Sequence, residues 1–285
     1  MRSPLLAAVK AVQHAFGGSG LGRVKPVRAL YDLVYGWFKP DSVQVQGHRM
    51  WLDDKDTLEL ATREVYEPME TALLVKELRK GDVFVDIGAN IGYYTLIAAR
   101  AVGESGRVRA FEPDPANFKL LVRNVAANGY SNADLMELAV SDREGDAKLY
   151  LNETNRGDHR IYDAGEKRGA VPIRTVTLDG YFKKLDKRVD FIKMDVQGAE
   201  ALALAGMKGL LRRNRKVKLL TEFDPGHLRN CGSDAARFLS DLREAGFKLF
   251  EVSEKEKTVK PASDRYLLER YGAGNGEYTN LFCVK

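Results

Sequence analysis

Residues 81–92, Gly-Asp-Val-Phe-Val-Asp-Ile-Gly-Ala-Asn-Ile-Gly, decide the fold of this chain. The nearly continuous apolar run at 83–87 lies between two glycines, which is typical of a strand buried on both faces. Apolar side chains then recur with helical spacing at positions 94, 97, 98 and 101, and Gly103 closes that pattern. The stretch therefore predicts a buried strand, a tight turn and a helix.

The same pattern repeats immediately downstream. A strand is expected at 108–112, and Asp114 is expected to cap a helix that has Pro115 at its first position and ends at Asn128-Gly129. Alternation of strands and helices predicts an α/β protein with a Rossmann-like, doubly wound sheet, whose ligand site lies at the carboxyl ends of its strands. Further strands are expected at 135–140, 148–151, 171–176, 189–194, 217–223, 247–252 and 281–284.

The chain is divided here into an N-terminal segment, 1–65, and a main domain, 66–285. Alternating residues at 43–53 predict a β-hairpin. The aromatic residues around 31–37 predict a helix that packs on the main domain, forms a dimer contact or touches a membrane surface. The apolar start at 5–9 is interrupted by Lys10, so we expect a short amphipathic helix rather than a signal peptide, and a cytoplasmic protein.

Charge is distributed unevenly along the 285 residues. The first 40 residues carry six basic side chains and one acidic one, whereas the remaining 39 basic and 39 acidic side chains balance. A nucleic-acid partner is therefore not expected, and only the N-terminal arm suits an anionic surface. Cys231 and Cys283 form neither a disulfide framework nor a metal-ligand motif.

The turn after the first strand carries the cofactor signal. Gly88 and Gly92 allow close approach of a ligand to the backbone, and Asn90 tolerates a left-handed conformation. Their spacing is not that of a dinucleotide fingerprint, and Asp86 would repel a pyrophosphate. Alone, the glycines also fit an ordinary strand-to-helix turn. Asp86 instead suits a ligand with an ammonium group, and Glu112 can accept hydrogen bonds from the hydroxyls of a ribose. This combination indicates S-adenosylmethionine.

Several motifs in order resemble the FkbM family of class I S-adenosylmethionine-dependent methyltransferases, from about Tyr66 to the end of the chain. They are residues 81–95, Phe-Glu-Pro-Asp-Pro at 111–115, Thr-Leu-Asp at 177–179 and Ile-Lys-Met-Asp-Val-Gln-Gly-Ala-Glu at 192–200. The resemblance implies a seven-stranded sheet with an antiparallel last strand. It also implies O-methylation of a hydroxyl on a sugar, polyketide or related product.

The resemblance further assigns cofactor contacts to positions of this chain. The methionine part is assigned to Asp86, Gly88, Asn90 and Gly92, the ribose to Glu112, and the adenine border to Ser141 and Asp142. Gln197 departs from the family, which more often has glutamate there, so an essential charge at this position is not expected.

An aliphatic hydroxyl needs a base to take its proton, and three places supply candidates. Asp195 ends a strand, where it could alternatively cap the next helix. His159 lies in a polar insertion, 152–170, together with the acceptor-binding candidates Asn155, Asp158 and Arg160. Glu222 ends another strand and is followed by His227, although that segment also suits a helix start.

Three other functions were weighed. Asp195, Glu200 and Glu222 could together bind Mg²⁺, but separated carboxylates at strand ends are common, and no metal is expected. A nicotinamide-dependent oxidoreductase is disfavoured by the glycine spacing. A cofactor-binding scaffold without turnover keeps the same motifs. The expected partner is a small-molecule or glycan hydroxyl acceptor.

Overall fold

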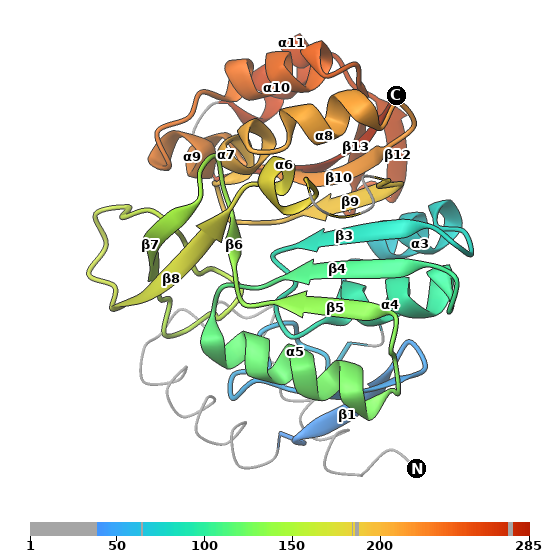
Figure 1. The fold of residues 1–285 in the computed structure, drawn as a ribbon. Helices are drawn as coiled ribbons and strands as arrows, with labels where there is room; N and C mark the ends of the chain where they lie inside the picture. Colours follow the sequence, from blue (N-terminus) through green and yellow to red (C-terminus); the bar gives the residue numbers. More distant parts are fainter. Residues whose placement is uncertain (1–38, 64, 184, 186–187, 273–275) are drawn as a thin grey trace.

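A large sheet forms the centre of the molecule (Figure 1). The computed structural model describes residues 39–63, 65–183, 185, 188–272 and 276–285. In these residues the sheet has eight strands in the order β12-β11-β13-β10-β9-β3-β4-β5. Their bounds are β3 Val83–Ile87, β4 Arg107–Phe111, β5 Ala133–Met136, β9 Phe191–Met194, β10 Lys218–Phe223, β11 Lys248–Ser253, β12 Thr258–Pro261 and β13 Thr279–Val284.

Strand direction confirms the predicted doubly wound fold. Strands β3, β4, β5, β9 and β10 pair in parallel, and the last strand, β13, inserts antiparallel between β10 and β11. The eighth strand, β12, is an addition to the expected seven and pairs antiparallel outside β11. The chain order reverses between β3 and β9, which is where a doubly wound sheet places its ligand.

Helices cover both faces of the sheet because successive strand residues point to opposite sides. Phe84 packs in one core with α3 Pro68–Glu77, α4 Tyr93–Val102 and α5 Pro115–Ala127, whereas Val85 packs in the other. The helices that bound the second core are α6 Leu178–Tyr181, α7 Glu200–Ala205, α8 Lys208–Arg213, α9 Pro225–Asn230, α10 Ala235–Glu244 and α11 Asp264–Tyr271. The expected cap of α5 is confirmed, since Asp114 accepts hydrogen bonds from the backbone of Ala116 and Asn117.

A second, three-stranded sheet lies beside the large one (Figure 1). It contains β6 Ala139–Val140, β7 Gly145–Tyr150 and β8 Ala170–Val176, in the order β6-β8-β7. The single strand predicted at 135–140 is therefore wrong. Residues 133–136 pair with β4, whereas 139–140 turn away to pair with β8, so one apolar run serves two sheets.

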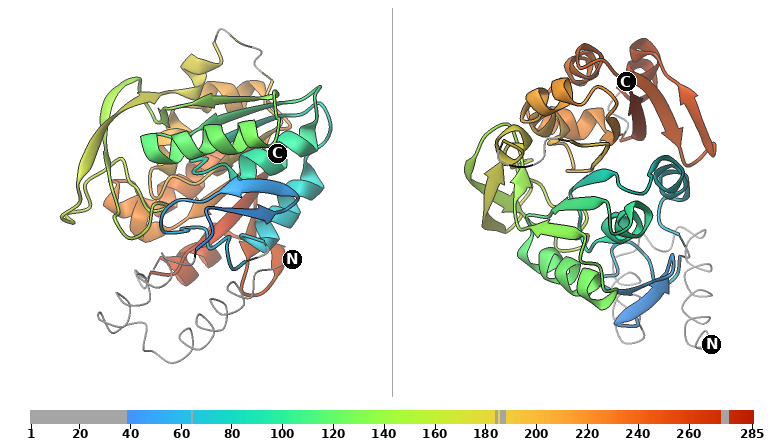
Figure 2. Two further views of the ribbon diagram at one scale, coloured as in Figure 1. Left: turned by 90° about the horizontal axis from the view of Figure 1, so that it is seen from below. Right: turned by 45° about the vertical axis from the view of Figure 1, so that its right-hand side comes forward.

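The predicted hairpin is confirmed as β1 Ser42–Val45 and β2 His48–Trp51, and Figure 2 shows it against α5. Asn124 of α5 accepts from the Trp51 amide at 2.6 Å and donates to its carbonyl at 3.0 Å. Val45 and Met50 share a core with Leu96 of α4. The predictions for the basic arm fall on residues 1–38, outside the described residues. No helix in the described ranges is both long and apolar enough to span a membrane.

Candidate functional site

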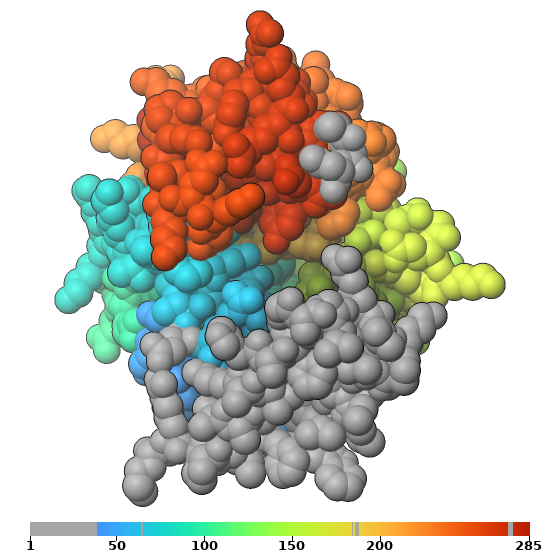
Figure 3. Space-filling view, turned by 180° about the vertical axis from the view of Figure 1, so that it is seen from behind, coloured from blue at the N-terminus to red at the C-terminus, as the bar shows by residue number. Residues whose placement is uncertain are grey.

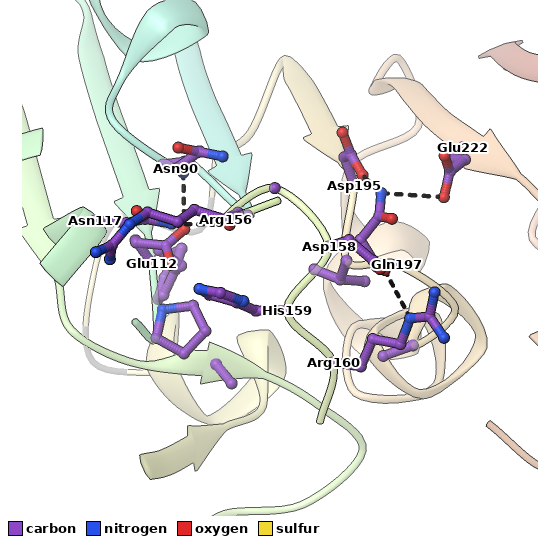
Figure 4. Close-up of a pocket in the computed structure, with 18 of the residues that line it drawn as sticks. Asn90, Glu112, Asn117, Arg156, Asp158, His159, Arg160, Asp195, Gln197 and Glu222 are labelled. Atoms are coloured by element: carbon purple, nitrogen blue, oxygen red, sulfur yellow. Dashed lines mark hydrogen bonds and ion pairs between the residues drawn. The ribbon is translucent and has the colours of Figure 1, made fainter. Parts of the chain in front are cut away.

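One cavity of about 390 Å³ opens at the carboxyl ends of β3, β4, β9 and β10 (Figure 4). Segment 155–161 of the predicted insertion supplies the facing wall. The cavity falls within the roughly 300–1,000 Å³ typical of small-molecule sites. Of the predicted site residues, it is lined by Gly88, Asn90, Glu112, Asn155, Asp158, His159, Arg160, Asp195, Glu222 and His227.

The turn after β3 has the backbone geometry expected from its sequence. Gly88 and Gly92 adopt φ values of 81° and 96°, and Asn90 is left-handed with φ 51°. A Cβ on Gly88 would lie 1.9 Å from the backbone oxygen of Asp195, so only glycine fits where these two segments meet. The Asn90 side chain accepts a hydrogen bond from the next amide, Ile91, which stabilises the turn.

Glu112 follows β4 and presents a buried carboxylate to the cavity, with 6% of the residue exposed. One oxygen accepts from the Asn90 amide at 2.7 Å and the other from the Asp114 amide at 2.9 Å. Burial raises the pKa of this carboxyl to about 8 in spite of both bonds. The backbone therefore fixes an acceptor whose remaining lone pairs face the cavity.

An apolar slot adjoins Glu112. The side chains that form it come from three segments and are Phe111, Pro113, Leu138, Val140 and Leu149. The predicted adenine neighbours Ser141 and Asp142 are not among the lining residues described. Ser141 is buried and donates to Asp142 at 3.1 Å. The residues just before Ser141 line the slot instead.

Asp86 lies beneath the turn rather than in the cavity wall. It is 1% exposed, and its Oδ2 accepts a hydrogen bond from Thr95 at 2.6 Å. Its Oδ1 has no hydrogen-bond partner among the described residues. Burial raises the pKa of Asp86. The prediction that Asp86 contacts the methionine part of a cofactor remains a prediction.

A carboxylate pair lies at the opposite end of the cavity, on β9 and β10. Gln197 donates from its amide nitrogen to Asp195 at 2.8 Å and to Glu222 at 3.5 Å, so it bridges the two (Figure 4). Lys193 donates to the other oxygen of Asp195 at 3.3 Å. Burial, followed by the charge of Asp195, raises the pKa of Glu222 well above its usual value. One neutral and one ionised carboxyl is the arrangement that such a pair favours.

Glu67 completes this end of the cavity and was not predicted from the sequence. It precedes α3 with a left-handed φ of 43°, and its carboxylate accepts from the Tyr94 hydroxyl at 2.7 Å. Burial raises the pKa of Glu67, although Lys193 opposes the change. Non-glycine residues with positive φ concentrate at functional sites, and three line this cavity, namely Glu67, Asn90 and Gln197.

Lys193, also missed by the sequence analysis, carries the positive charge of this end. The residue is 4% exposed and its ammonium lies 4.6 Å from the centre of the Tyr94 ring. The charges of Asp195, Glu67, Glu70 and Asp86 raise the pKa of Lys193 although burial lowers it. A lysine inside a strand that is otherwise apolar could have been recognised in the sequence as a candidate site residue, because strands buried on both faces are usually apolar throughout.

The polar insertion folds over the strand ends and is not a solvated loop. His159 lies at the Glu112 side of the cavity (Figure 4), where its Nδ1 accepts from the Asn152 amide at 3.0 Å. Its Nε2 lies 3.6 Å from Asp114. Arg156 donates to Asp54 at 2.7 Å. His159 is thus held against the cap of α5 and not beside Asp195.

The predicted acceptor-binding residues of the insertion are paired with one another. Arg160 is buried and donates to Asp158 at 2.7 Å, and its second nitrogen lies 3.1 Å from Nε2 of His227. Arg168 also binds Asp158, at 2.8 Å. Asn155 accepts from the Gly157 amide at 2.9 Å. These contacts shape the wall of the cavity and anchor it to α9.

Asp195, Glu200 and Glu222 do converge, as the metal alternative required. Each offers an oxygen within 4.8 Å of the others. Glu200, however, accepts hydrogen bonds from the amides of Val196 and Gly198 and so shapes the turn after β9. The other two carboxylates are bridged by Gln197. The trio thus already has hydrogen-bond partners.

Residues 86–249, more than half of the chain, match the family model of the methyltransferase FkbM domain. This chain belongs to the FkbM methyltransferase family. The matched segment begins at Asp86 and includes Glu112, the insertion and both carboxylates of the pair. Most of the residues that line the cavity lie within this matched segment.

Curated relatives are similar over part of their length. Hexuronic acid methyltransferase AglP of Haloferax volcanii is 27% identical over 142 residues, which cover 49% of this chain and 56% of that protein. Methyltransferase 1 of Beauveria bassiana is 28% identical over 143 residues, covering 43% and 57% respectively. The chain thus spans little more than half the length of these relatives.

Solved methyltransferase structures are also similar. An S-adenosylmethionine-dependent O-methyltransferase from Thermotoga maritima has a TM-score of 0.42 and 16% identity, with 88% of this chain and 81% of that chain covered. A precorrin-6y C5,15-methyltransferase from Geobacter metallireducens has a TM-score of 0.43 and 11% identity, with 75% and 88% covered.

Proposed function

We propose that this chain transfers a methyl group from S-adenosylmethionine to a hydroxyl of a sugar, glycan or other small natural product. The observation that carries the proposal is a single cavity with a fixed carboxylate, Glu112, at one end and a bridged pair, Asp195 and Glu222, at the other. S-adenosylmethionine supplies an activated methyl group on a sulfonium, so the protein chiefly binds and orients the reactants.

The Glu112 side of the cavity suits the nucleoside of the cofactor. Glu112 has lone pairs left for the two hydroxyls of a ribose, and the apolar slot beside it suits a flat base. The left-handed residues Gly88 and Asn90 line the cavity, so a ligand there could approach the backbone of this turn closely. The orphaned Oδ1 of Asp86 adds a buried negative group behind that turn.

We assign proton removal to the bridged pair. Asp195 accepts hydrogen bonds from Lys193 and Gln197, so its carboxylate is oriented. Asp195 receives the proton, and Glu222, with its raised pKa, is the neutral partner that can relay it by passing on its own proton. A positioned base contributes roughly 10²–10⁴-fold to such a reaction. His159 lies at the other end and serves better as a support for Asp114 and the Glu112 turn.

The proposal is tested by incubating the protein with methyl-labelled S-adenosylmethionine and a panel of neutral glycosides and hydroxylated natural products. We expect label to appear on an oxygen of one panel class, with S-adenosylhomocysteine formed in equal amount. Label on nitrogen or carbon would contradict O-methylation. Tight cofactor binding without any transfer would favour the scaffold alternative, and enhanced fluorescence of bound NADH would favour the oxidoreductase.

A further inference from the structure

A second cavity, of about 590 Å³, lies on the same rim of the sheet, beyond β10. It is lined by residues of segments 57–63 and 66–68, by the end of β11, by the end of α11 and by residues 276–280, which lead into β13. Figure 3 shows the face where the chain leading into α3, in blue to cyan, meets the C-terminal strands, in orange to red. The two cavities adjoin, because both are lined by Thr57, Leu58, Tyr66, Glu67 and Tyr278.

The wall of the second cavity is held by contacts far apart in sequence. Glu254, after β11, accepts hydrogen bonds from the amides of Met69 at 2.7 Å and Glu70 at 3.3 Å, so it caps the start of α3. Asn280 of β13 donates to the Glu70 carboxylate. These bonds fix the left-handed Glu67 between the two cavities. A cavity built in this way is preformed, as ligand sites usually are.

Tyr278 presents an exposed aromatic ring at the junction. The residue is 57% exposed although it borders both cavities and directly precedes β13. Tyr66 also lines both cavities and packs edge-on against Tyr93, with ring centres 5.7 Å apart. An exposed ring with polar groups around it suits an amphipathic partner, which places CH groups on the ring and hydroxyls at its edge.

The charged side chains at the junction between the two cavities disfavour an anionic acceptor. Glu67, Asp195 and Glu222 all line the first cavity, and Lys193 is the cation among them. Three cations line the second cavity: Arg63 binds Glu59 at 2.5 Å, Arg270 binds Glu256 at 3.2 Å, and Lys255 is exposed. Four acids line it, namely Glu59, Glu67, Glu254 and Glu277. A carboxylate carried by the acceptor near the transfer point would meet the Asp195 carboxylate, whereas hydroxyls would find hydrogen-bond acceptors.

From these observations we infer that the second cavity is the acceptor site and that it takes a neutral polyhydroxylated ring, stacked on Tyr278. The inference rests on the proposed function and deepens it. The ring lies between Tyr278 and Tyr66, with one hydroxyl directed past Glu67 to the Asp195–Glu222 pair. On transfer, the hydroxyl oxygen forms a bond to the methyl carbon, the sulfur–methyl bond breaks, and the hydroxyl proton passes to the carboxylate pair.

The test uses the full chain saturated with S-adenosylhomocysteine and two probes that differ only at C6: methyl β-glucopyranoside, with a neutral hydroxymethyl group, and methyl β-glucuronopyranoside, with a carboxylate. Binding is followed by ligand-observed NMR titration. We expect the neutral glycoside to bind at least tenfold more tightly than the glucuronide. Tyr278→Ala should weaken its binding at least tenfold, with S-adenosylhomocysteine affinity within twofold of wild type. Val259→Ala, at an exposed site on β12, is the matched control.

Tyr278→Phe separates stacking from hydrogen bonding and should retain most of the affinity. Preference for the glucuronide, equal binding to wild type and Tyr278→Ala, or binding of neither probe would each overturn the inference. If the wild-type protein did not bind S-adenosylhomocysteine, the proposed function itself would be overturned. Failure of the inference and failure of the proposed function are therefore distinguishable.

Discussion

The two ends of the first cavity hold their carboxylates in different ways. At the Glu112 end, comprising residues 88–92, Glu112 and Asp114, the carboxylates accept from backbone amides of the turn and of α5. At the Asp195 end, comprising Glu67, Lys193, Asp195, Gln197 and Glu222, they are held by side chains. Under the proposed function, the backbone-held end binds the cofactor and the end held by side chains carries out proton transfer, so the two tasks are divided along one cavity.

The largest effect is expected from removing charge at the Asp195 end. Asp195→Asn should lower turnover about 10²-fold or more, because the base loses its proton-accepting form. Glu222→Gln should act in the same direction, because an amide side chain cannot relay the proton. Rates at saturating cofactor measure this, with Asp146→Asn on the exposed strand β7 as a control that keeps wild-type turnover. Full activity of both Asp195→Asn and Glu222→Gln would remove proton transfer from this end.

The second largest effect is expected from a substitution at Gly88, where the two ends of the cavity are in contact. Gly88→Ala places a methyl group against the Asp195 carbonyl and should lower the free energy of unfolding by about 1–3 kcal/mol more than Gly129→Ala. Gly129 is also left-handed, with φ 71°, but an added Cβ there meets nothing within 4 Å in the described chain. Denaturant unfolding of both variants measures the difference, and equal losses would show that the contact is not tight.

The pH dependence of cofactor binding should report the Glu112 end. Ribose hydroxyls favour the ionised carboxylate, so binding lowers the Glu112 pKa from about 8 and releases a proton below that pH. Affinity for S-adenosylhomocysteine should therefore rise with pH, by up to about tenfold per unit, and level off above pH 8. Calorimetric titrations from pH 6 to 9 measure it. A flat profile in the wild-type protein would contradict this assignment.

The smallest effect is expected at His159. His159→Ala removes a support of Asp114 and the insertion, and should raise the KM for the cofactor about threefold, since one hydrogen bond contributes about 0.5–1.5 kcal/mol. The kcat should change less than the KM. Steady-state kinetics at varied cofactor concentration separate the two, and a tenfold loss of kcat alone would restore His159 as the base.

The fold and the residues of the Glu112 end could be predicted from the sequence, because both depend on residues that lie close together in the chain. Strand ends, the left-handed Asn90 and the Asp114 cap are local features, and all are found in the structure. Glu67 and Tyr278 were not predicted to line a cavity. Their segments are brought there only by the packing of α3 and the insertion of β13 into the sheet. Periodicity carries no information on such contacts, nor on the turn that sends 139–140 into a second sheet.

The most direct test of this division is a calorimetric titration of two variants, Glu112→Gln and Asp195→Asn, with S-adenosylhomocysteine at pH 8. S-adenosylhomocysteine lacks the sulfonium charge, so only the nucleoside and amino-acid contacts are measured. We predict that Glu112→Gln weakens binding by about 1–3 kcal/mol, as expected for lost charge-assisted hydrogen bonds, and that Asp195→Asn binds within twofold of wild type. Unchanged binding by Glu112→Gln, together with a large loss of S-adenosylhomocysteine affinity in Asp195→Asn, would contradict the assignment of cofactor binding to the Glu112 end and chemistry to the Asp195 end.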